Sequence, residues 1–185
     1  MSSDWKAAVR NDRAAKDEYF RTDPHSPIPP DERDAFDGLA YYRIDESYRF
    51  ELDLHEYDDK EPVTVGTSTG GEQEYLRWGA FHFEIGGDEI TLDAYKSDPD
   101  DDRLWVPFRD ATSGEETYGA GRYLDLETDT HLTDDGRWIL DFNEAYNPTC
   151  AYSDRYECPL PPTANWLDVP IEAGEKAYGE SDADH

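Results

Sequence analysis

The chain has 185 residues, and 17 Lys and Arg against 45 Asp and Glu give a formal net charge of −28. Nucleic-acid binding takes most of its affinity from cations that neutralise phosphates, and an anionic membrane repels an acidic surface in the same way, so neither partner is expected. No run approaches the about 20 apolar residues of a membrane span, and the N-terminus has no basic segment followed by an apolar one, which predicts a cytoplasmic protein.

An N-terminal helix is predicted within residues 1–23. Ser3 or Asp4 can cap it, and the proline-rich stretch 24–30 ends it. Its apolar side is expected to comprise the residues at about helical spacing, namely Trp5, Ala8, Val9, Ala15, Tyr19 and Phe20. We expect this helix to pack on a single β-rich domain of residues 24–178, which an acidic flexible tail, 179–185, follows.

After the helix, apolar and polar residues alternate with the period of two that is typical of strands. The alternation covers 48–54, 81–85 and 90–94. Gly86 and Gly87 separate the last two segments and supply the positive φ angles of a tight hairpin. These segments therefore predict half-buried strands, two of which are adjacent and antiparallel.

Further strands are predicted in the second half of the chain. Residues 104–108 have the pattern of a buried strand, and 121–126 is expected to pair with 137–142 across a loop that ends at Gly136. Many short strands, frequent turn signals and one helix predict a mainly β protein. Its sheet is antiparallel and forms a barrel or a sandwich, which the pattern does not distinguish.

Two short motifs have a structural explanation. Residues 66–70 match G-x-S-x-G, in which a strained turn between a strand and a helix exposes a nucleophilic serine. No helix is predicted after residue 70, so a glycine-rich hairpin turn is favoured over a hydrolase site. The acidic run 98–102 lacks the glycine and the final glutamate of a calcium loop, which favours a solvated turn.

A polar constellation lies in two stretches, 108–123 and 141–150. Convergent polar groups among aromatic side chains are typical of a ligand pocket. The period of two places Asp141 and Asn143 opposite Phe142, facing a cavity or solvent, and Arg122 is expected to pair with Asp141 or Asp110. The predicted ligand-binding residues are Asp110, Thr112, Ser113, Thr117, Tyr118, Arg122, Asp141, Asn143, Tyr146 and Asn147.

Three functions fit this constellation. The first is a small-molecule binding domain. The second is a hydrolase or isomerase in which Asp110 or Asp141 is the general base, Arg122 stabilises an anion, and Tyr118 or Thr117 positions the substrate. The third is a structural or interaction module in which the motif closes loops. The sequence identifies neither a cofactor nor a ligand, and it leaves the oligomeric state open.

The two cysteines, Cys150 and Cys158, are separated by seven residues. A disulfide there would restrict the unfolded chain by about 2.5 kcal/mol, but a reducing cytosol disfavours it. Structural zinc needs four ligands, which two cysteines alone do not supply, and no metal site is expected. Packed or redox-labile thiols are favoured, with a disulfide as the alternative.

Two long segments resemble a known family. They are FRDATSGEETYGAGRYLDL (108–126) and LDFNEAYNPTCAYSDRYECPLPPTANWLDVPIEAGEK (140–176), and they resemble the family catalogued as domain of unknown function 1684. The likeness covers most of residues 25–176, with departures at Thr149 and Trp166. Because that family has no settled activity, the resemblance implies only that the ten residues above, with Cys150, Cys158 and Asn165, belong to its pattern.

The acidity leads to a prediction about salt. Like charges at this density destabilise a compact state, and the Debye length falls to about 3 Å in molar salt. We therefore interpret the chain as a folded protein of a salt-rich cytoplasm. Its melting temperature is expected to rise steeply between low and molar potassium chloride, and a flat melting temperature over that range would contradict the interpretation.

Overall fold

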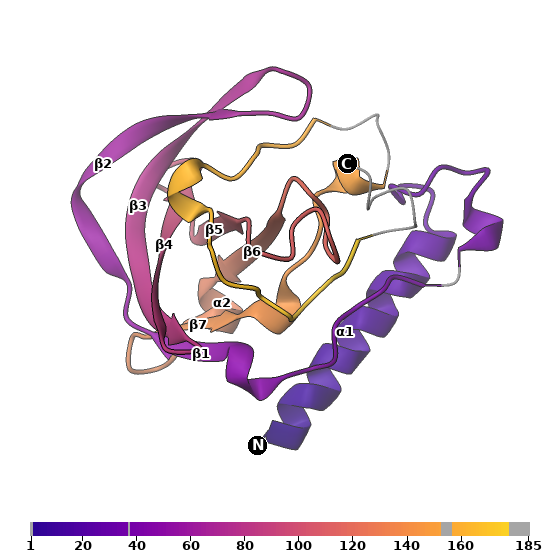
Figure 1. The fold of residues 1–185 in the computed structure, drawn as a ribbon, viewed down its shortest axis with the longest axis horizontal. Helices are drawn as coiled ribbons and strands as arrows, with labels where there is room; N and C mark the ends of the chain where they lie inside the picture. Colours follow the sequence, from indigo (N-terminus) through magenta and orange to yellow (C-terminus); the bar gives the residue numbers. More distant parts are fainter. Residues whose placement is uncertain (1, 37, 153–156, 178–185) are drawn as a thin grey trace.

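The computed structural model describes residues 2–36, 38–152 and 157–177. A long helix, α1 (Ser2–Thr22), precedes a β-rich body, and a short helix, α2 (Thr128–His131), connects two strands (Figure 1). Short 3-10 turns occur at Arg33–Ala35, Glu46–Tyr48, Phe142–Glu144, Thr149–Ala151 and Thr163–Asn165. Within the described ranges, no helix combines the length and the apolar character needed to cross a membrane. The predicted tail, 179–185, lies outside the described residues.

The strands form two antiparallel sheets. The larger has five strands in the order β2, β3, β4, β5 and β6, whose bounds are His55–Gly66, Glu72–Ile85, Asp88–Lys96, Arg103–Phe108 and Arg122–Glu127. The smaller pairs β1 (Arg49–Leu52) with β7 (Trp138–Asp141). The protein is therefore mainly β with one N-terminal helix, as predicted. Neither sheet closes into a barrel in the described part of the chain, because β2 and β6 remain edge strands.

The predicted pairing of 121–126 with 137–142 is wrong. Strand β6 pairs with β5, where Phe108 is opposite Arg122, and β7 pairs with β1, where Arg49 is opposite Asp141. The connection between β6 and β7 contains helix α2 and a turn at Gly136, so it is not a simple hairpin. Because of this connection, β7 lies outside the large sheet and pairs with β1, about 90 residues earlier in the chain.

The two other predicted hairpins, at the glycine-rich turns, are confirmed. Strands β3 and β4 are joined by Gly86 and Gly87, whose φ angles are 60° and 89°. The G-x-S-x-G segment forms the turn between β2 and β3, with Gly70 at φ 87°. The segment is therefore a hairpin turn, and it has none of the strand-to-helix geometry of a nucleophile elbow.

The main core lies between the two sheets. Phe50 of β1 contacts Phe83 of β3 at a centroid distance of 4.8 Å, and Phe142, just after β7, meets Phe108 of β5 at 5.3 Å. The fully or nearly fully buried residues around them include Phe81, Leu92, Leu104, Val106, Leu124, Leu126 and Leu140. Burial of this apolar surface holds the large sheet curved over the small one.

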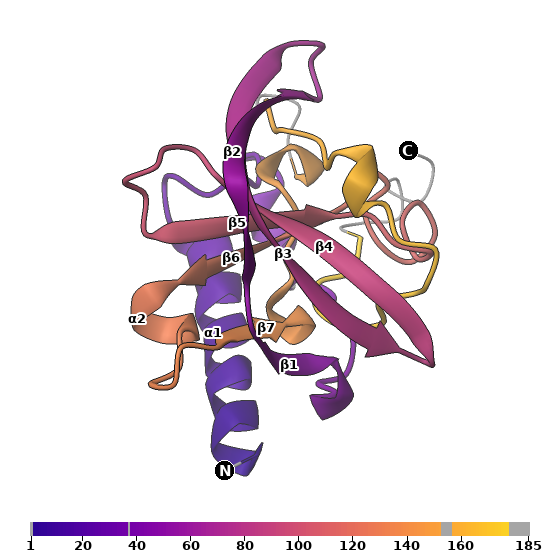
Figure 2. The same ribbon diagram turned by 90° about the vertical axis from the view of Figure 1, so that its left-hand side faces the viewer.

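Helix α1 lies along the side of the body away from strands β2 to β4 (Figures 1 and 2). Val9 and Phe20 are buried as predicted, but Ala8, Ala15 and Tyr19 are exposed. The inner face instead includes the cations Arg13 and Lys16. Arg13 donates hydrogen bonds to backbone carbonyls and Lys16 pairs with a buried carboxylate, so polar partners replace part of the expected apolar contact.

Candidate functional site

The predicted site residues fall into two groups in space. Asp110, Thr112, Ser113 and Thr117 gather around the buried pair of Asp110 and Arg122, whereas Asp141, Asn143 and Tyr146 contact helix α1. No direct contact joins Arg122 to Asp141 in the described structure. Both groups contact one segment, residues 171–175, near the end of the described chain.

Asp110 is completely occupied by internal donors. Its carboxylate accepts hydrogen bonds from the hydroxyls of Thr112 and Ser113 at 2.9 and 3.2 Å, and from the backbone N–H of Ile171 at 2.5 Å. The hydroxyl of Thr112 also lies 2.9 Å from that of Thr117. With its side chain fully buried, Asp110 has no surface from which to reach a substrate.

Arg122 connects Asp110 and its neighbours to residues 171–175. Its side chain is fully buried and pairs with Asp110 through one Nη2–Oδ2 contact of 3.3 Å, so the pair is not bidentate. The guanidinium also donates to the backbone carbonyls of Ile171 (2.8 Å), Ala173 and Glu175 (3.2 Å). Burial lowers the pKa of Arg122, and the Asp110 carboxylate opposes that shift. We call Asp110, Thr112, Ser113, Thr117 and Arg122 the arginine cluster.

Asp141 and Asn143 are covered by the helix, and neither faces open solvent. The indole Nε1 of Trp5 donates to Asp141 at 2.7 Å, and Asn143 donates to the same carboxylate through its backbone N–H and its side-chain amide. Asn143 also exchanges two hydrogen bonds with the backbone of Asp45. Burial raises the pKa of Asp141. The role of Asp110 or Asp141 as a general base stays a prediction, and the internal partners of both carboxylates do not favour it.

The other predicted residues have varied surroundings. The hydroxyl of Tyr146 donates to Asp125, and the amide of Asn147 donates to the carbonyl of Lys176 at 2.9 Å. The hydroxyl of Tyr118 lies 3.5 Å from Cys150 Sγ. The catalytic role of Tyr118 stays a prediction.

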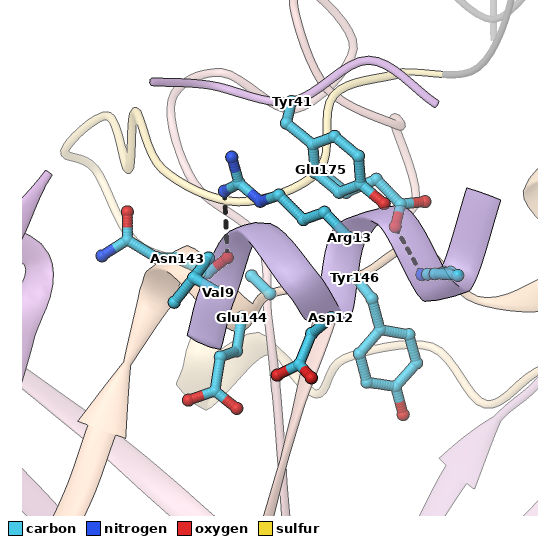
Figure 3. Close-up of a pocket in the computed structure, with 10 residues that line it drawn as sticks. Val9, Asp12, Arg13, Tyr41, Asn143, Glu144, Tyr146 and Glu175 are labelled. Atoms are coloured by element: carbon cyan, nitrogen blue, oxygen red, sulfur yellow. Dashed lines mark hydrogen bonds and ion pairs between the residues drawn. The ribbon is translucent and has the colours of Figure 1, made fainter. Parts of the chain in front are cut away.

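A pocket of about 200 Å³ lies between helix α1 and the body (Figure 3). We call it the helix pocket. Two of the predicted residues, Asn143 and Tyr146, line it. Its other lining residues are Val9, Asp12, Arg13, Lys16, Tyr41, Glu144, Ala145 and Glu175. The structure therefore brings part of the predicted motif to a cavity whose opposite wall is the helix.

Glu175 is the most unusual group in the helix pocket. Only 1% of its side chain is exposed, and its Oε2 accepts from Lys16 Nζ at 2.5 Å. Among the described residues, its Oε1 is buried without a hydrogen-bond partner, as are the hydroxyl of Tyr41 and Nε of Arg13. Burial raises the pKa of Glu175, and Lys16 opposes that shift. Figure 3 shows Tyr41 and Glu175 side by side, as expected from their β-bridge.

Most of the helix-pocket residues were not predicted from the sequence. Val9, Asp12, Arg13 and Lys16 are spaced i, i+3, i+4 and i+7, which places them on one face of a helix. The available signal for this pocket was that Asp12, Arg13 and Lys16 share one helix face with the apolar residue Val9. Glu175 follows Gly174 in the segment that resembles the family, but nothing in its local pattern indicates burial.

Cys150 and Cys158 are both free thiols. The backbone N–H of Cys150 lies 3.4 Å from Cys158 Sγ, and the hydroxyl of Thr149 lies 3.5 Å from it. A hydrogen bond from the Cys150 thiol, with these two donors, lowers the pKa of Cys158 to about 6, and the same bond raises the pKa of Cys150. No group of three or more metal-ligating side chains gathers in residues 2–36, 38–152 and 157–177.

Comparisons with known proteins give two findings. A family model described as protein of unknown function (DUF1684) matches residues 34–176. The chain is also similar to an uncharacterized protein of the halophile Haloarcula marismortui, known from a solution NMR structure. The two are 42% identical, with 95% of each chain covered and a TM-score of 0.72. No match is found among the curated proteins.

Proposed function

The chain belongs to the DUF1684 family of proteins of unknown function, and we propose that it is a small-molecule binding protein whose ligand occupies the helix pocket. The observation that carries this proposal is the unpaired Oε1 of Glu175 at the pocket wall. An unsatisfied buried polar atom costs about 1–3 kcal/mol, so a protein that keeps one beside a cavity gains that energy back when a ligand pairs with it.

The arginine cluster supports the proposal as a positioning device. Arg122 binds the carbonyls of Ile171, Ala173 and Glu175, and the N–H of Glu175 donates to the carbonyl of Ala145 at 3.0 Å. These bonds hold the backbone of Glu175 on two sides while its side chain faces the helix. A site held by rigid supporting bonds loses less entropy when it binds. The arginine cluster then serves ligand binding by positioning Glu175, although only two of the predicted ligand-binding residues, Asn143 and Tyr146, line the helix pocket.

The pocket chemistry suggests the class of ligand. Arg13 and Lys16 provide positive charge, and Asp12, Glu144 and Glu175 provide negative charge, so the lining is close to neutral. Tyr41 and Tyr146 contribute aromatic surface. A volume of about 200 Å³ admits a small polar molecule. We expect a ligand that donates a hydrogen bond to Glu175 and exchanges others with Tyr41 and Arg13.

The two alternatives explain less of the structure. An enzyme that uses Asp110 or Asp141 as a base requires a carboxylate within reach of its substrate, and both are bonded internally. A purely structural module explains the arginine cluster, whose side chains bond to one another and to the backbone. Nε of Arg122 also has no partner among the described residues, but only Glu175 and Tyr41 combine an unpaired buried oxygen with a place in the lining of the helix pocket.

A retained small molecule is the expected result of native mass spectrometry. The protein is purified in high salt, exchanged rapidly and measured before and after incubation with a total small-molecule extract. The Glu175→Gln variant is expected to lose at least about nine-tenths of the bound mass, because an amide replaces the carboxylate that faces the pocket. The matched control is Glu172→Gln, since Glu172 is exposed and lies outside the pocket lining. The proposal would be contradicted if the wild type shows only the apo mass before and after incubation, or if Glu175→Gln retains as much ligand as the wild type.

A further inference from the structure

A second pocket, of about 250 Å³, lies beside the outer surface of strands β5 and β6. We call it the aromatic pocket, because half of its lining residues carry aromatic rings. The lining comprises Tyr75, Tyr95, Ser97, Asp101, Arg103, Trp105, Tyr123, Asp125, Tyr146 and Pro159. Only Tyr146 is shared with the helix pocket. None of its other residues was predicted as a site from the sequence.

The rings of this pocket form a continuous wall. Tyr75 stacks on Trp105 at a centroid distance of 4.5 Å, Trp105 meets Tyr123 edge-on at 5.2 Å, and Tyr123 meets Tyr146 edge-on at 5.8 Å. These residues belong to a cluster that is separate from the main core, also includes Val65 and contacts Val63. Rings from four strands line the pocket, so a small guest contacts aromatic surface from several side chains.

One carboxylate accompanies the rings. Asp125 accepts a hydrogen bond from the Tyr146 hydroxyl through Oδ2, and its Oδ1 makes no hydrogen bond with the described residues. Burial raises the pKa of Asp125, and the bond from Tyr146 opposes that shift. Arg103 is exposed at the same pocket and forms no salt bridge with the described part of the chain. Its charge acts on Asp125 and Tyr146 and opposes the rise in the pKa of both groups.

We propose that the aromatic pocket binds an organic cation whose charge is carried by a methylated nitrogen. Aromatic faces attract a cation through the ring quadrupole, and several rings around one quaternary nitrogen form the aromatic cage that recognises such groups. Asp101 and Asp125 add negative charge, which outweighs that of Arg103. Methyl groups fit the apolar ring faces, whereas a bare ammonium would have to give up strong hydration. This proposal does not rest on the ligand proposed for the helix pocket, although Tyr146 lines both pockets.

Proton NMR titration with choline tests this proposal. The N-methyl protons are expected to move upfield in a saturable way, because they enter the ring currents of Trp105 and its neighbours. The control ligand is 3,3-dimethylbutan-1-ol, which has the same shape without the charge, and it is expected to bind about 10-fold more weakly. Equal affinity for the two molecules, or no saturable shift with choline, would overturn the proposal.

Three variants separate a cation site from other aromatic sites. Asp125→Asn is expected to weaken choline binding several-fold, and Arg103→Gln to strengthen it, because that change removes a like charge. Tyr75→Leu keeps an apolar side chain at a half-buried position but removes one ring, and it is expected to reduce the upfield shift. Glu172→Gln, an exposed position outside the lining of both pockets, is expected to leave the titration unchanged. Weaker binding by Arg103→Gln would indicate an anion site and overturn the proposal even if Tyr75→Leu does not fold.

Discussion

Replacement of Arg122 by methionine is expected to lower the free energy of unfolding by about 3–5 kcal/mol. The change leaves the Asp110 carboxylate buried without its cation, and it removes the donors to three carbonyls of residues 171–175. Urea unfolding at constant molar potassium chloride measures the loss without altering charge screening. Arg122→Lys is expected to recover only part of it, because a single ammonium cannot reproduce the planar set of guanidinium donors.

The matched control for Arg122→Met is Arg137→Met. Arg137 also pairs with an aspartate, Asp135, but its side chain is 43% exposed and that of Asp135 is 61% exposed. Exposed pairs contribute about 0–1 kcal/mol, so this variant is expected to unfold almost like the wild type. A loss below about 1 kcal/mol for Arg122→Met would refute the positioning role given to the arginine cluster.

Replacement of Gly174 by alanine is the second change with a large expected effect. Gly174 has a φ of 83°, and an added Cβ would lie 2.6 Å from the carbonyl oxygen of Phe142 and 2.8 Å from that of Ala145. Both obstacles are backbone atoms, so the segment itself has to move. The left-handed conformation costs an alanine about 1–2 kcal/mol and overpacking adds about 1–3 kcal/mol. We expect a total loss of about 2–5 kcal/mol in urea unfolding.

Gly136→Ala isolates the contribution of the clash. Gly136 has nearly the same φ, 87°, but nothing lies within 4 Å of an added Cβ. Gly136→Ala therefore carries only the conformational cost. The free energy of unfolding is expected to fall by about 1–3 kcal/mol more for Gly174→Ala than for Gly136→Ala. Equal losses would show that segment 171–175 is loosely packed. Because Glu175 follows Gly174 directly, any Gly174→Ala protein that still folds is also expected to lose the helix-pocket ligand.

Much of the local structure was predictable because it depends on neighbours in the sequence. The alternation over 90–94 and the adjacent Gly86 and Gly87 predicted a hairpin, and strands β3 and β4 form it. The buried pattern of 104–108 likewise predicted β5, all of whose residues after Arg103 are buried. A period of two and a positive φ are properties of short segments, so they are visible without knowledge of the fold.

The pairing of β7 was not predictable by the same reasoning. A hairpin between 121–126 and 137–142 is the shortest connection, but β7 contributes Leu140 to a core that it shares with β1. Which strand lies opposite another over a long sequence separation depends on how the complete core packs. The local pattern of 137–142 contains no information about Arg49 or Phe50.

The candidate site was likewise predictable in part. The sequence indicated that Asp110, Arg122 and Asp141 belong to one polar constellation, and their burial agrees with an unusual environment. It did not indicate that Asp110 and Asp141 face separate sets of partners. Helix α1 accounts for this difference, because Trp5 covers Asp141 from a position 136 residues away.

The mainly β class, the N-terminal helix, the two glycine-rich hairpins and the resemblance to DUF1684 were predictable, since each depends on a local pattern or a contiguous motif. The sequence also contains the acidity from which the salt dependence is expected. The division into two sheets, the helix pocket and the burial of Glu175 are visible only in the folded protein. These depend on contacts between α1, residues 41–42, 143–146 and 171–175, and such contacts arise only when the complete chain packs and excludes water from their polar groups.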